Sequence, residues 1–364
     1  ARLGGLTGPH PGINFDGVIE GVQSHENIRS VSNCKNFSLF YGEAESLFDR
    51  DLKAKTRTGD PIADVFLVEK TENRVFIGLA DGELWGEKAR EGARRSLLHI
   101  KNKLSKVKIT SIESAISEIE NASLGIEDLL KKHGNLVAIA YGLVLKVKNW
   151  EGKSKDITPS NIFICASIGV CKAYCYSSSS GFVSEITTID SSRICLSGTQ
   201  EPTSTETNKK SESDQICLYS FSCEENDIIF LVSDGLHRNI DPQALRSLPV
   251  TLGLPGNSWE EIYHDPELRK MAEIIKQQFR ETTLRNLIKG IEGEITPQTI
   301  VKTLMEFAND VTTDKRQVHE EISMQNWVDE KDKKKAVAFE RQMRLRVKES
   351  RGKLDHVCVV AAEI

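Results

Sequence analysis

Three aspartates stand at the ends of unusually apolar segments. Asp81 lies at the end of FIGLADG and Asp234 at the end of IIFLVSDG, and each is followed by glycine, whereas Asp355 precedes HVCVVAAEI. A buried strand that stops at a carboxylate places that group at the rim of a sheet, and the glycine allows a sharp turn there. If the three strands share one core, the three carboxylates meet at one end of it.

Clustered carboxylates repel one another, so this arrangement requires a counter-charge. A hard divalent cation with oxygen ligands, Mg²⁺ or Mn²⁺, is the natural occupant. The alternative is that each Asp-Gly pair is simply a turn after a strand. Spacing alone leaves both interpretations open.

The elements expected to position these residues do not alternate regularly. The sequence predicts a strand at 37–44, a hairpin at 63–82, helices at 87–105 and 111–132, several middle strands, a mainly helical region at 258–350 and a final strand. This order favours antiparallel sheets with helices packed outside them, an α+β layering.

Length and composition set broad limits. The chain has 364 residues, 28% of them charged, and a formal net charge of −5, which gives no indication of a nucleic-acid partner. No apolar run reaches the ~18 residues of a membrane span. The eight cysteines form no CxxC pair, so zinc is not indicated, and reduced thiols fit a cytoplasmic or nuclear compartment. Because the sequence does not begin with Met, an upstream targeting segment stays an open question.

Four segments resemble a known family. FIGLADGELWG, SIGVCKAY, IIFLVSDGL and KLDHVCVVAAEI occur in the order found in the metal-dependent protein phosphatases of the 2C type. The resemblance implies a central β-sandwich of two mainly antiparallel sheets flanked by helices on both sides. It also implies one or two Mg²⁺ or Mn²⁺ ions that activate water against a phosphoserine or phosphothreonine of a phosphoprotein substrate.

The same resemblance suggests a domain organisation. An extended arm at 1–35 would precede a 2C-like domain at 36–364. Within that domain we expect a mobile loop at 197–214, which is rich in Ser and Thr, and a helical insertion at 258–350.

Roles for individual residues follow from the resemblance. Asp81 would bridge two metal ions and orient the water between them, and the Gly82 carbonyl would bind the second ion. Asp234 and Asp355 would complete the shell of the first ion, and Asp64 falls where the family has an aspartate.

Several positions depart from the family pattern. Ala63 replaces a glutamate that binds the second metal, although Asp60 could reach in from the loop before it. Arg57 is the candidate for holding the substrate phosphate, with a solvated basic loop as the alternative. Glu83 stands where the family has His, either near the metals or facing solvent, and Val170 removes an accessory metal ligand.

Two further features have simple interpretations. His237 is expected to be a surface or packing residue rather than a general acid. The charged segment 328–351 mixes acids and bases, which favours a solvated helix over one that binds nucleic acid. The sequence does not indicate an oligomeric state.

Two functions from different classes are compatible with these features. The first is a metal-dependent serine/threonine phosphatase with a partly degenerate second-metal site. The second is a catalytically inactive pseudophosphatase that binds or scaffolds a partner, which Ala63 and Val170 favour. A metallohydrolase acting on non-protein phosphates is a more distant third.

Overall fold

The computed structural model describes most of the folded body of the chain. The described residues are 10–11, 18–19, 39–51, 56–71, 74–83, 85–133, 137–146, 161–188, 194–195, 216–324 and 333–364. The loop expected at 197–214 lies outside these ranges, as does most of the expected arm at 1–35.

Two sheets form the centre of the molecule, and all their neighbouring strands are antiparallel. The first sheet has the strand order β1-β3-β15-β14-β10-β11. Its strands are β1 (His10–Pro11), β3 (Phe40–Ser46), β10 (Lys172–Tyr176), β11 (Val183–Glu185), β14 (Ile228–Val232) and β15 (His356–Glu363).

The second sheet has the order β12-β13-β9-β8-β7-β6-β2, again antiparallel throughout. A separate two-stranded ribbon joins β4 (Arg50–Asp51) to β5 (Thr56–Arg57). The strands of the second sheet are β2 (Val18–Ile19), β6 (Val65–Thr71), β7 (Arg74–Gly82), β8 (Val137–Lys146), β9 (Asn161–Ile168), β12 (Ile194–Cys195) and β13 (Cys217–Cys223).

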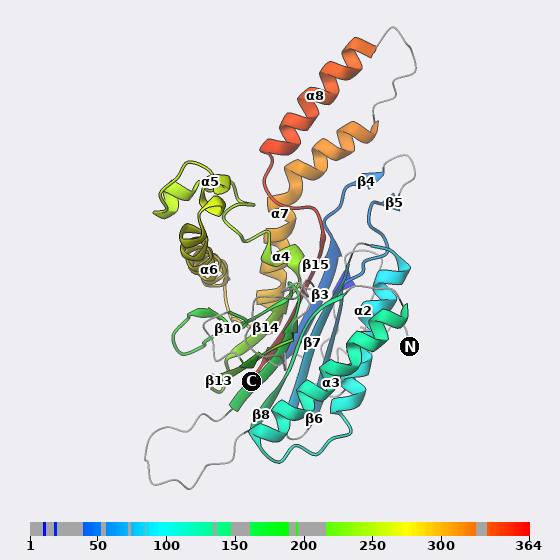
Figure 1. The fold of residues 1–364 in the computed structure, drawn as a ribbon, viewed down its shortest axis with the longest axis vertical. Helices are drawn as coiled ribbons and strands as arrows, with labels where there is room; N and C mark the ends of the chain where they lie inside the picture. The colour runs from blue at the N-terminus through cyan, green and yellow to red at the C-terminus, as the bar shows by residue number, and fades with distance from the viewer. Residues whose placement is uncertain are drawn as a thin grey trace, which may run out of the picture.

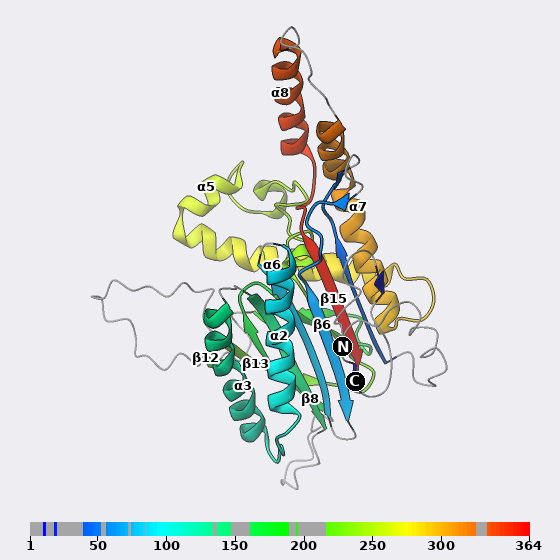
Figure 2. The ribbon, with the colours of Figure 1, turned by 90° about the vertical axis from the view of Figure 1, so that its right-hand side faces the viewer.

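Helices cover the outer faces of both sheets (Figures 1 and 2). The second sheet carries α2 (Glu87–Leu104) and α3 (Ile112–His133), whose apolar residues recur at helical spacing. The remaining helices are α4 (Asp234–His237), η2 (Pro249–Leu252), α5 (Trp259–His264), α6 (Pro266–Lys289), α7 (Pro297–Met324) and α8 (Lys333–Glu349).

Three apolar layers hold this arrangement together. One lies between the two sheets and includes Phe163, Ile77 and Val360, all of them fully buried. A second lies between the first sheet and α4, α6 and α7, and a third lies between the second sheet and α2 and α3. The fold is therefore α+β, a sandwich of two antiparallel sheets flanked by helices on both sides, as expected from the resemblance.

The register of the strands brings four chain segments to one edge of the sandwich. Val65, at the start of β6, pairs with Ala80 near the end of β7. Val232, at the end of β14, pairs with Val359 near the start of β15, and β15 also contacts β6 and β7 across the sandwich. The residues just outside these strand ends are therefore neighbours in space.

Some segments differ from the expected boundaries. The strand predicted at 37–44 is observed at Phe40–Ser46. Two dipeptides of the N-terminal arm join the sheets: β1 pairs with β3 in the first sheet, and β2 pairs with β6 in the second. Among the described helices, none has a stretch long and apolar enough to cross a membrane.

Candidate metal centre

Asp64, which immediately precedes β6, is the most deeply buried carboxylate of the site. Its exposed fraction is 0%, and neither carboxylate oxygen has a hydrogen-bond partner of normal geometry among the described residues. Ser233 lies close enough to favour its ionised form, but burial and the neighbouring Asp81 raise the pKa of Asp64 well above its usual range. Burying an unpaired carboxylate costs free energy, so a positive charge bound near Asp64 would stabilise the site.

Asp81, at the end of β7, belongs to the same cluster. Burial in the first place, and then the nearby carboxylates of Asp234 and Asp355, raise its pKa from the usual 3.8 to about 7. Asp234, at the start of α4, also has a raised pKa, first because of burial and then because of Asp355. The structure thus brings together Asp64 and the three aspartates singled out by the sequence.

Two cationic side chains approach the outer part of this cluster. The Lys353 Nζ lies 2.5 Å from Asp355 Oδ2 and 3.4 Å from Asp234 Oδ2. The Arg238 guanidinium lies 3.1 Å from the same oxygen of Asp234. Lys353 therefore supplies, to two of the four carboxylates, the charge that a metal ion would supply.

The four aspartates interact electrostatically as one cluster, but their oxygens are not arranged around a common metal position. In the described part of the chain, no three His, Cys, Asp or Glu side chains are arranged so that they could hold a metal ion as they stand. Yet four aspartates interact strongly with one another. Lys353 lies between Asp234 and Asp355, in the place where a metal ion would draw their oxygens together, and this accounts for the difference. The donor set, which consists of hard oxygens around an orphaned buried carboxylate, fits Mg²⁺ or Mn²⁺ once Lys353 moves aside.

Glycines allow other segments to pack closely against these strand ends. A Cβ at Gly235 would stand 1.8 Å from the carbonyl oxygen of His356, so β15 can run beside Asp234 only because this residue lacks a side chain. A Cβ at Gly82 would stand 2.5 Å from the Ala89 carbonyl of α2. Both Asp-Gly pairs are thus required for close packing, whereas neither glycine has the positive φ that would make it necessary for the turn itself.

His356 fixes the loop that carries Asp60 and Ala63. Its Nε2 donates to the Gly59 carbonyl at 2.8 Å, and its Nδ1 accepts from the Ala63 amide at 3.3 Å. Burial lowers the pKa of His356, which favours the neutral ring that this pair of contacts needs. The side chain next to Asp355 therefore ties β15 to the segment that leads into Asp64.

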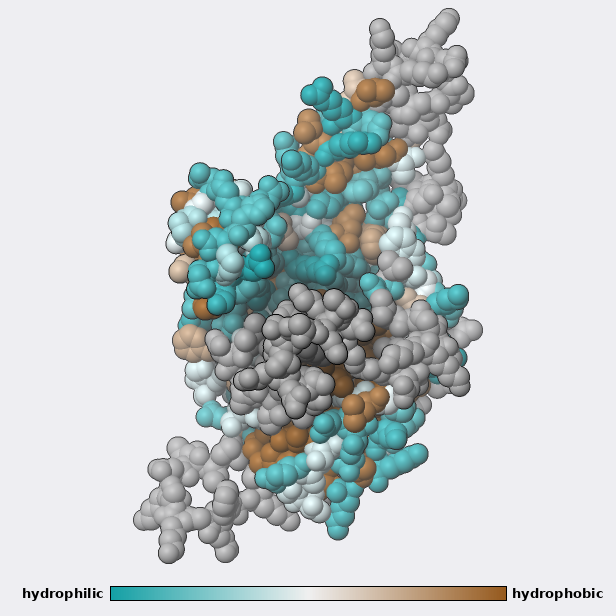
Figure 3. Space-filling model, viewed as in Figure 1, coloured by the Kyte–Doolittle hydropathy of each residue, from teal (hydrophilic) through white to brown (hydrophobic). Residues whose placement is uncertain are grey.

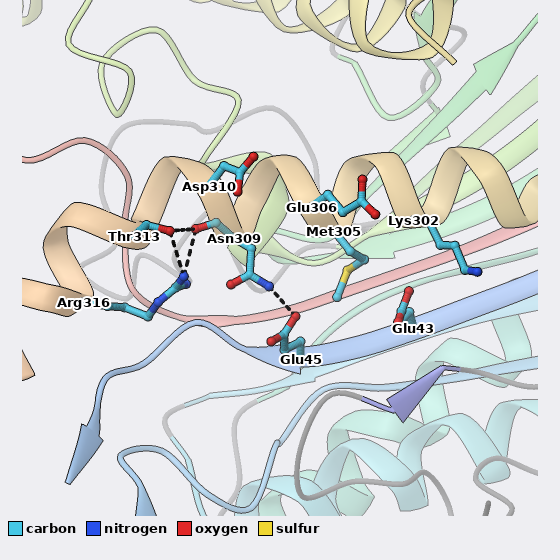
Figure 4. Close-up of a pocket in the computed structure, with 9 residues that line it drawn as sticks. All are labelled: Glu43, Glu45, Lys302, Met305, Glu306, Asn309, Asp310, Thr313 and Arg316. Atoms are coloured by element: carbon cyan, nitrogen blue, oxygen red, sulfur yellow. Dashed lines mark hydrogen bonds between the residues drawn. The ribbon is translucent and has the colours of Figure 1, made fainter. Parts of the chain in front are cut away.

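Arg57 is not brought together with the aspartates. Its guanidinium donates to the Ser46 carbonyl and lies 3.5 Å from Glu45 Oε1. Glu45 in turn accepts from Asn309 of α7 at 2.7 Å, in a cavity between β3 and α7 (Figure 4). In this position Arg57 neutralises a carboxylate on β3 instead of reaching toward a substrate at the aspartate cluster.

The remaining predicted positions lie at or near the rim. Asp60 and Glu83 are exposed, and Val170 is 37% exposed on the turn after β9. His237 is half-buried, and its Nδ1 lies 2.9 Å from the Tyr174 hydroxyl. Burial together with Arg280 and other cations lowers the pKa of His237 well below its usual range, so it packs as a neutral ring.

Three residues of the site were not singled out from the sequence: Ser233, Lys353 and His356. A signal existed for Lys353, because residues two apart in an extended segment point to the same side, as Lys353 and Asp355 do. For Ser233 the cue was its place between β14 and Asp234, where its hydroxyl accepts from the Cys358 amide at 2.9 Å. For His356, whose partners lie about 300 positions away along the chain, no local signal was present.

Comparison with curated proteins found a relative with a PP2C-like domain. This chain is 27% identical over 217 residues to the PP2C-like domain-containing protein CG9801 of Drosophila melanogaster, which covers 56% of the chain and 29% of that protein. The chain is a divergent relative of the PP2C-like proteins. It spans less than a third of the length of that PP2C-like relative.

Other comparisons of this chain with known proteins are weaker. No family model matches it. Among solved structures, it is 11% identical to the phosphatase domain of SpoIIE from Bacillus subtilis, with 89% of this chain and 93% of that chain covered and a TM-score of 0.39. It is also 11% identical to the PPM Ser-Thr phosphatase MsPP from Mycobacterium smegmatis, with 90% of this chain and 99% of that chain covered and a TM-score of 0.42. Scores this low leave the fold to be described from the sheets and helices above.

Proposed function

We propose that the chain is a metal-dependent phosphatase of phosphoserine or phosphothreonine residues. The observation that carries the proposal is the convergence of Asp64, Asp81, Asp234 and Asp355, with Asp64 buried and lacking a hydrogen-bond partner in the described part of the chain. Nothing in a sandwich core requires four repelling carboxylates. A binding site for Mg²⁺ or Mn²⁺ accounts for all four.

Asp81, Asp234 and Asp355 would hold the first ion, and Asp81 with the Gly82 carbonyl would contribute to a second. When bound, such ions lower the pKa of a coordinated water and neutralise the charge of a phosphate ester. Because Ala63 offers no carboxylate, any second ion would rely on fewer protein ligands, and Asp60 would have to turn inward from its exposed position.

Other residues of the chain would position these groups. Asp64 would orient Asp81 by sharing a proton with it, since the pKa values of both are raised. His356 would hold the loop at Gly59 against β15, and Ser233 would hold the end of β14. Since Arg57 is engaged with Glu45, the phosphate of the substrate would need another cation, and Arg238 lies beside Asp234.

A role limited to binding or scaffolding is less well supported. Such a protein would gain nothing from keeping Asp64 buried without a hydrogen-bond partner among the described residues, because replacing it by an apolar residue would stabilise the fold. The cost of this cluster is understandable where the carboxylates take part in chemistry.

The experiment is a hydrolysis assay with an aryl phosphate and with a phosphoserine peptide, each with and without Mn²⁺. We expect Mn²⁺-dependent turnover of both that falls to background in Asp81→Ala. Turnover by the native chain no greater than that of Asp81→Ala, at millimolar Mn²⁺, would overturn the proposal. Hydrolysis of the aryl phosphate but not of the peptide would favour a phosphatase of non-protein substrates.

A further inference from the structure

A basic cavity opens beside Asp234, between α4, α6 and the segment that leads into β15. Its volume is about 500 Å³, and we call it the basic pocket. Two of its lining side chains, Asp241 and Glu273, are acidic, whereas six are cationic: Lys172, Arg238, Arg246, Lys276, Arg280 and Lys353. In Figure 3, hydrophilic side chains fill the hollow between the α5–α6 helices and the α7–α8 helices.

Two of these cations are held rigidly in the wall. The side chains of Lys276 and Arg280, both on α6, are 6% and 8% exposed. Lys276 lies 3.3 Å from Asp241 and its Nζ stands 4.7 Å from the ring centre of Trp259, while Arg280 lies 3.3 Å from Asp241. Long cationic side chains that are buried and fixed in this way form a preorganised wall and not a solvated surface.

The positive charge of the wall is incompletely neutralised. Asp241 is shared by Lys276 and Arg280, and Glu185 is shared by Arg280 and Lys172. In these ion pairs two carboxylates therefore serve three cations, and Glu273 adds one further negative charge near Arg280. The Nε of Arg280 is buried and has no hydrogen-bond partner among the described residues.

A fourth cation has neutral partners. Arg246 donates to the carbonyls of Lys348 and Ser350 at the end of α8, which orient its guanidinium without cancelling its charge. The basic pocket thus presents an excess of oriented N–H donors. Groups with several charged oxygens, such as a phosphoryl group, match such donors best.

The basic pocket is continuous with the aspartate cluster. Arg238 and Lys353 line the pocket and also contact Asp234, at 3.1 Å and 3.4 Å. A peptide whose phosphorylated residue lies at the cluster would therefore carry its neighbouring residues past the pocket.

We propose that the basic pocket binds a second phosphorylated residue of the same substrate, so that the chain prefers multiply phosphorylated segments. This inference rests on the proposed function for the location of the first phosphate. It adds a substrate class that the four aspartates do not specify.

The test measures peptide binding without turnover. Two peptides, in which non-hydrolysable phosphonates replace the phosphates and which differ only in whether a second serine carries one, are titrated by fluorescence polarisation into the full chain in Mn²⁺. Lys276→Gln and Arg246→Gln each remove a pocket charge, and Lys270→Gln is the matched control. Lys270 lies on the same helix, but its side chain is 76% exposed and it is paired with Glu267. Thermal unfolding of each variant verifies that it is folded.

We expect the second phosphate to tighten binding to the native chain by about tenfold, as for one or two charge-assisted hydrogen bonds. The gain should fall below about threefold in the pocket variants and persist in Lys270→Gln. Equal affinities of the two peptides for the native chain would overturn the inference, as would a full gain in both pocket variants. Because this test measures binding and not hydrolysis, failure of the inference can be distinguished from failure of the proposed phosphatase activity.

Discussion

At the scale of single residues, the site is dominated by carboxylates that lack sufficient counter-charge. Asp64 and Asp81 are both held where burial raises the pKa; Asp81 raises the pKa of Asp64 further, and Asp234 and Asp355 contribute to the raised pKa of Asp81. Lys353 neutralises the outer pair, Asp234 and Asp355, but the described contacts give Asp64 no cationic partner. Two substitutions distinguish the effect of this cluster on the stability of the metal-free chain from its role in binding Mn²⁺.

Asp81→Asn removes one of the repelling charges. We expect the metal-free variant to be more stable than the native chain near neutral pH, because burial and the neighbouring aspartates oppose ionisation of Asp81. The same change should abolish the rise in melting temperature that Mn²⁺ produces in the native chain. Differential scanning fluorimetry in EDTA and in Mn²⁺ measures both effects, and a destabilised variant that still responds to Mn²⁺ would contradict this account.

Lys353→Met removes the cation that competes for Asp234 and Asp355. We expect the dissociation constant for Mn²⁺, measured by calorimetry, to fall about threefold to tenfold, since both contacts are partly exposed and each is worth little. Lys348→Met is the control, because Lys348 is exposed and belongs to α8. Weaker Mn²⁺ binding in Lys353→Met would show that Lys353 supports the site instead of competing for it.

At the scale of elements, the ends of β7, β14 and β15 could be predicted, because apolar strands closed by Asp-Gly or opened by Asp are visible in the sequence. The direction of Arg57 could not, since a basic loop does not reveal which carboxylate it will meet. Only the packing of α7 on β3 places Glu45 beside it. The contacts of His356 with Gly59 likewise depend on tertiary structure.

Gly235→Ala tests the contact between α4 and β15. The added Cβ would overlap the His356 carbonyl, so we expect the free energy of unfolding in urea to fall by about 2–4 kcal/mol. Gly290→Ala is the control, because Gly290 has a right-handed conformation and a Cβ there would meet its nearest neighbour at 3.4 Å. A loss for Gly235→Ala no larger than that of the control would mean that the two segments are not packed as described.

At the scale of the whole molecule, the layered sandwich explains how a costly site is tolerated. Three apolar layers stabilise the sheets and helices, and the four aspartates occupy one edge of the central layer. Cations of α6, together with those of β10, of the segment around α4 and of the segment that leads into β15, build a basic wall beside that edge. Acidic and basic regions therefore lie side by side, which suits a phosphorylated substrate and its metal ions.

The stability of the metal-free chain should depend on pH through this acidic edge. Raised carboxyl pKa values stabilise the folded state below the unfolded pKa, and that contribution is lost as the pH rises through the folded value, which is about 7 for Asp81 at this edge. Glu43, which lies on β3 in the cavity toward α7, adds to the effect because burial and the neighbouring Glu45 raise its pKa to about 7. His237 and His356 have lowered pKa values, so their contribution changes only below about 6.5. In EDTA, the free energy of unfolding should therefore fall between about pH 6.5 and 8.5.

Urea titrations across this range measure the pH effect, and Asp81→Asn should show a shallower dependence. Saturating Mn²⁺ should reverse it, because ionised carboxylates bind the metal. Metal-free stability that rises over the same range would show that the carboxylates are not held against ionisation.

The most direct test of the central claim is a crystal soaked in Mn²⁺ with anomalous diffraction recorded. We expect at least one strong anomalous peak bound by Asp81, Asp234 and Asp355, with the Lys353 ammonium displaced from its position between the last two. A second peak beside Gly82 would extend the site to two ions. A fully soaked crystal that shows no peak at these aspartates, with Lys353 still in place, would contradict the central claim.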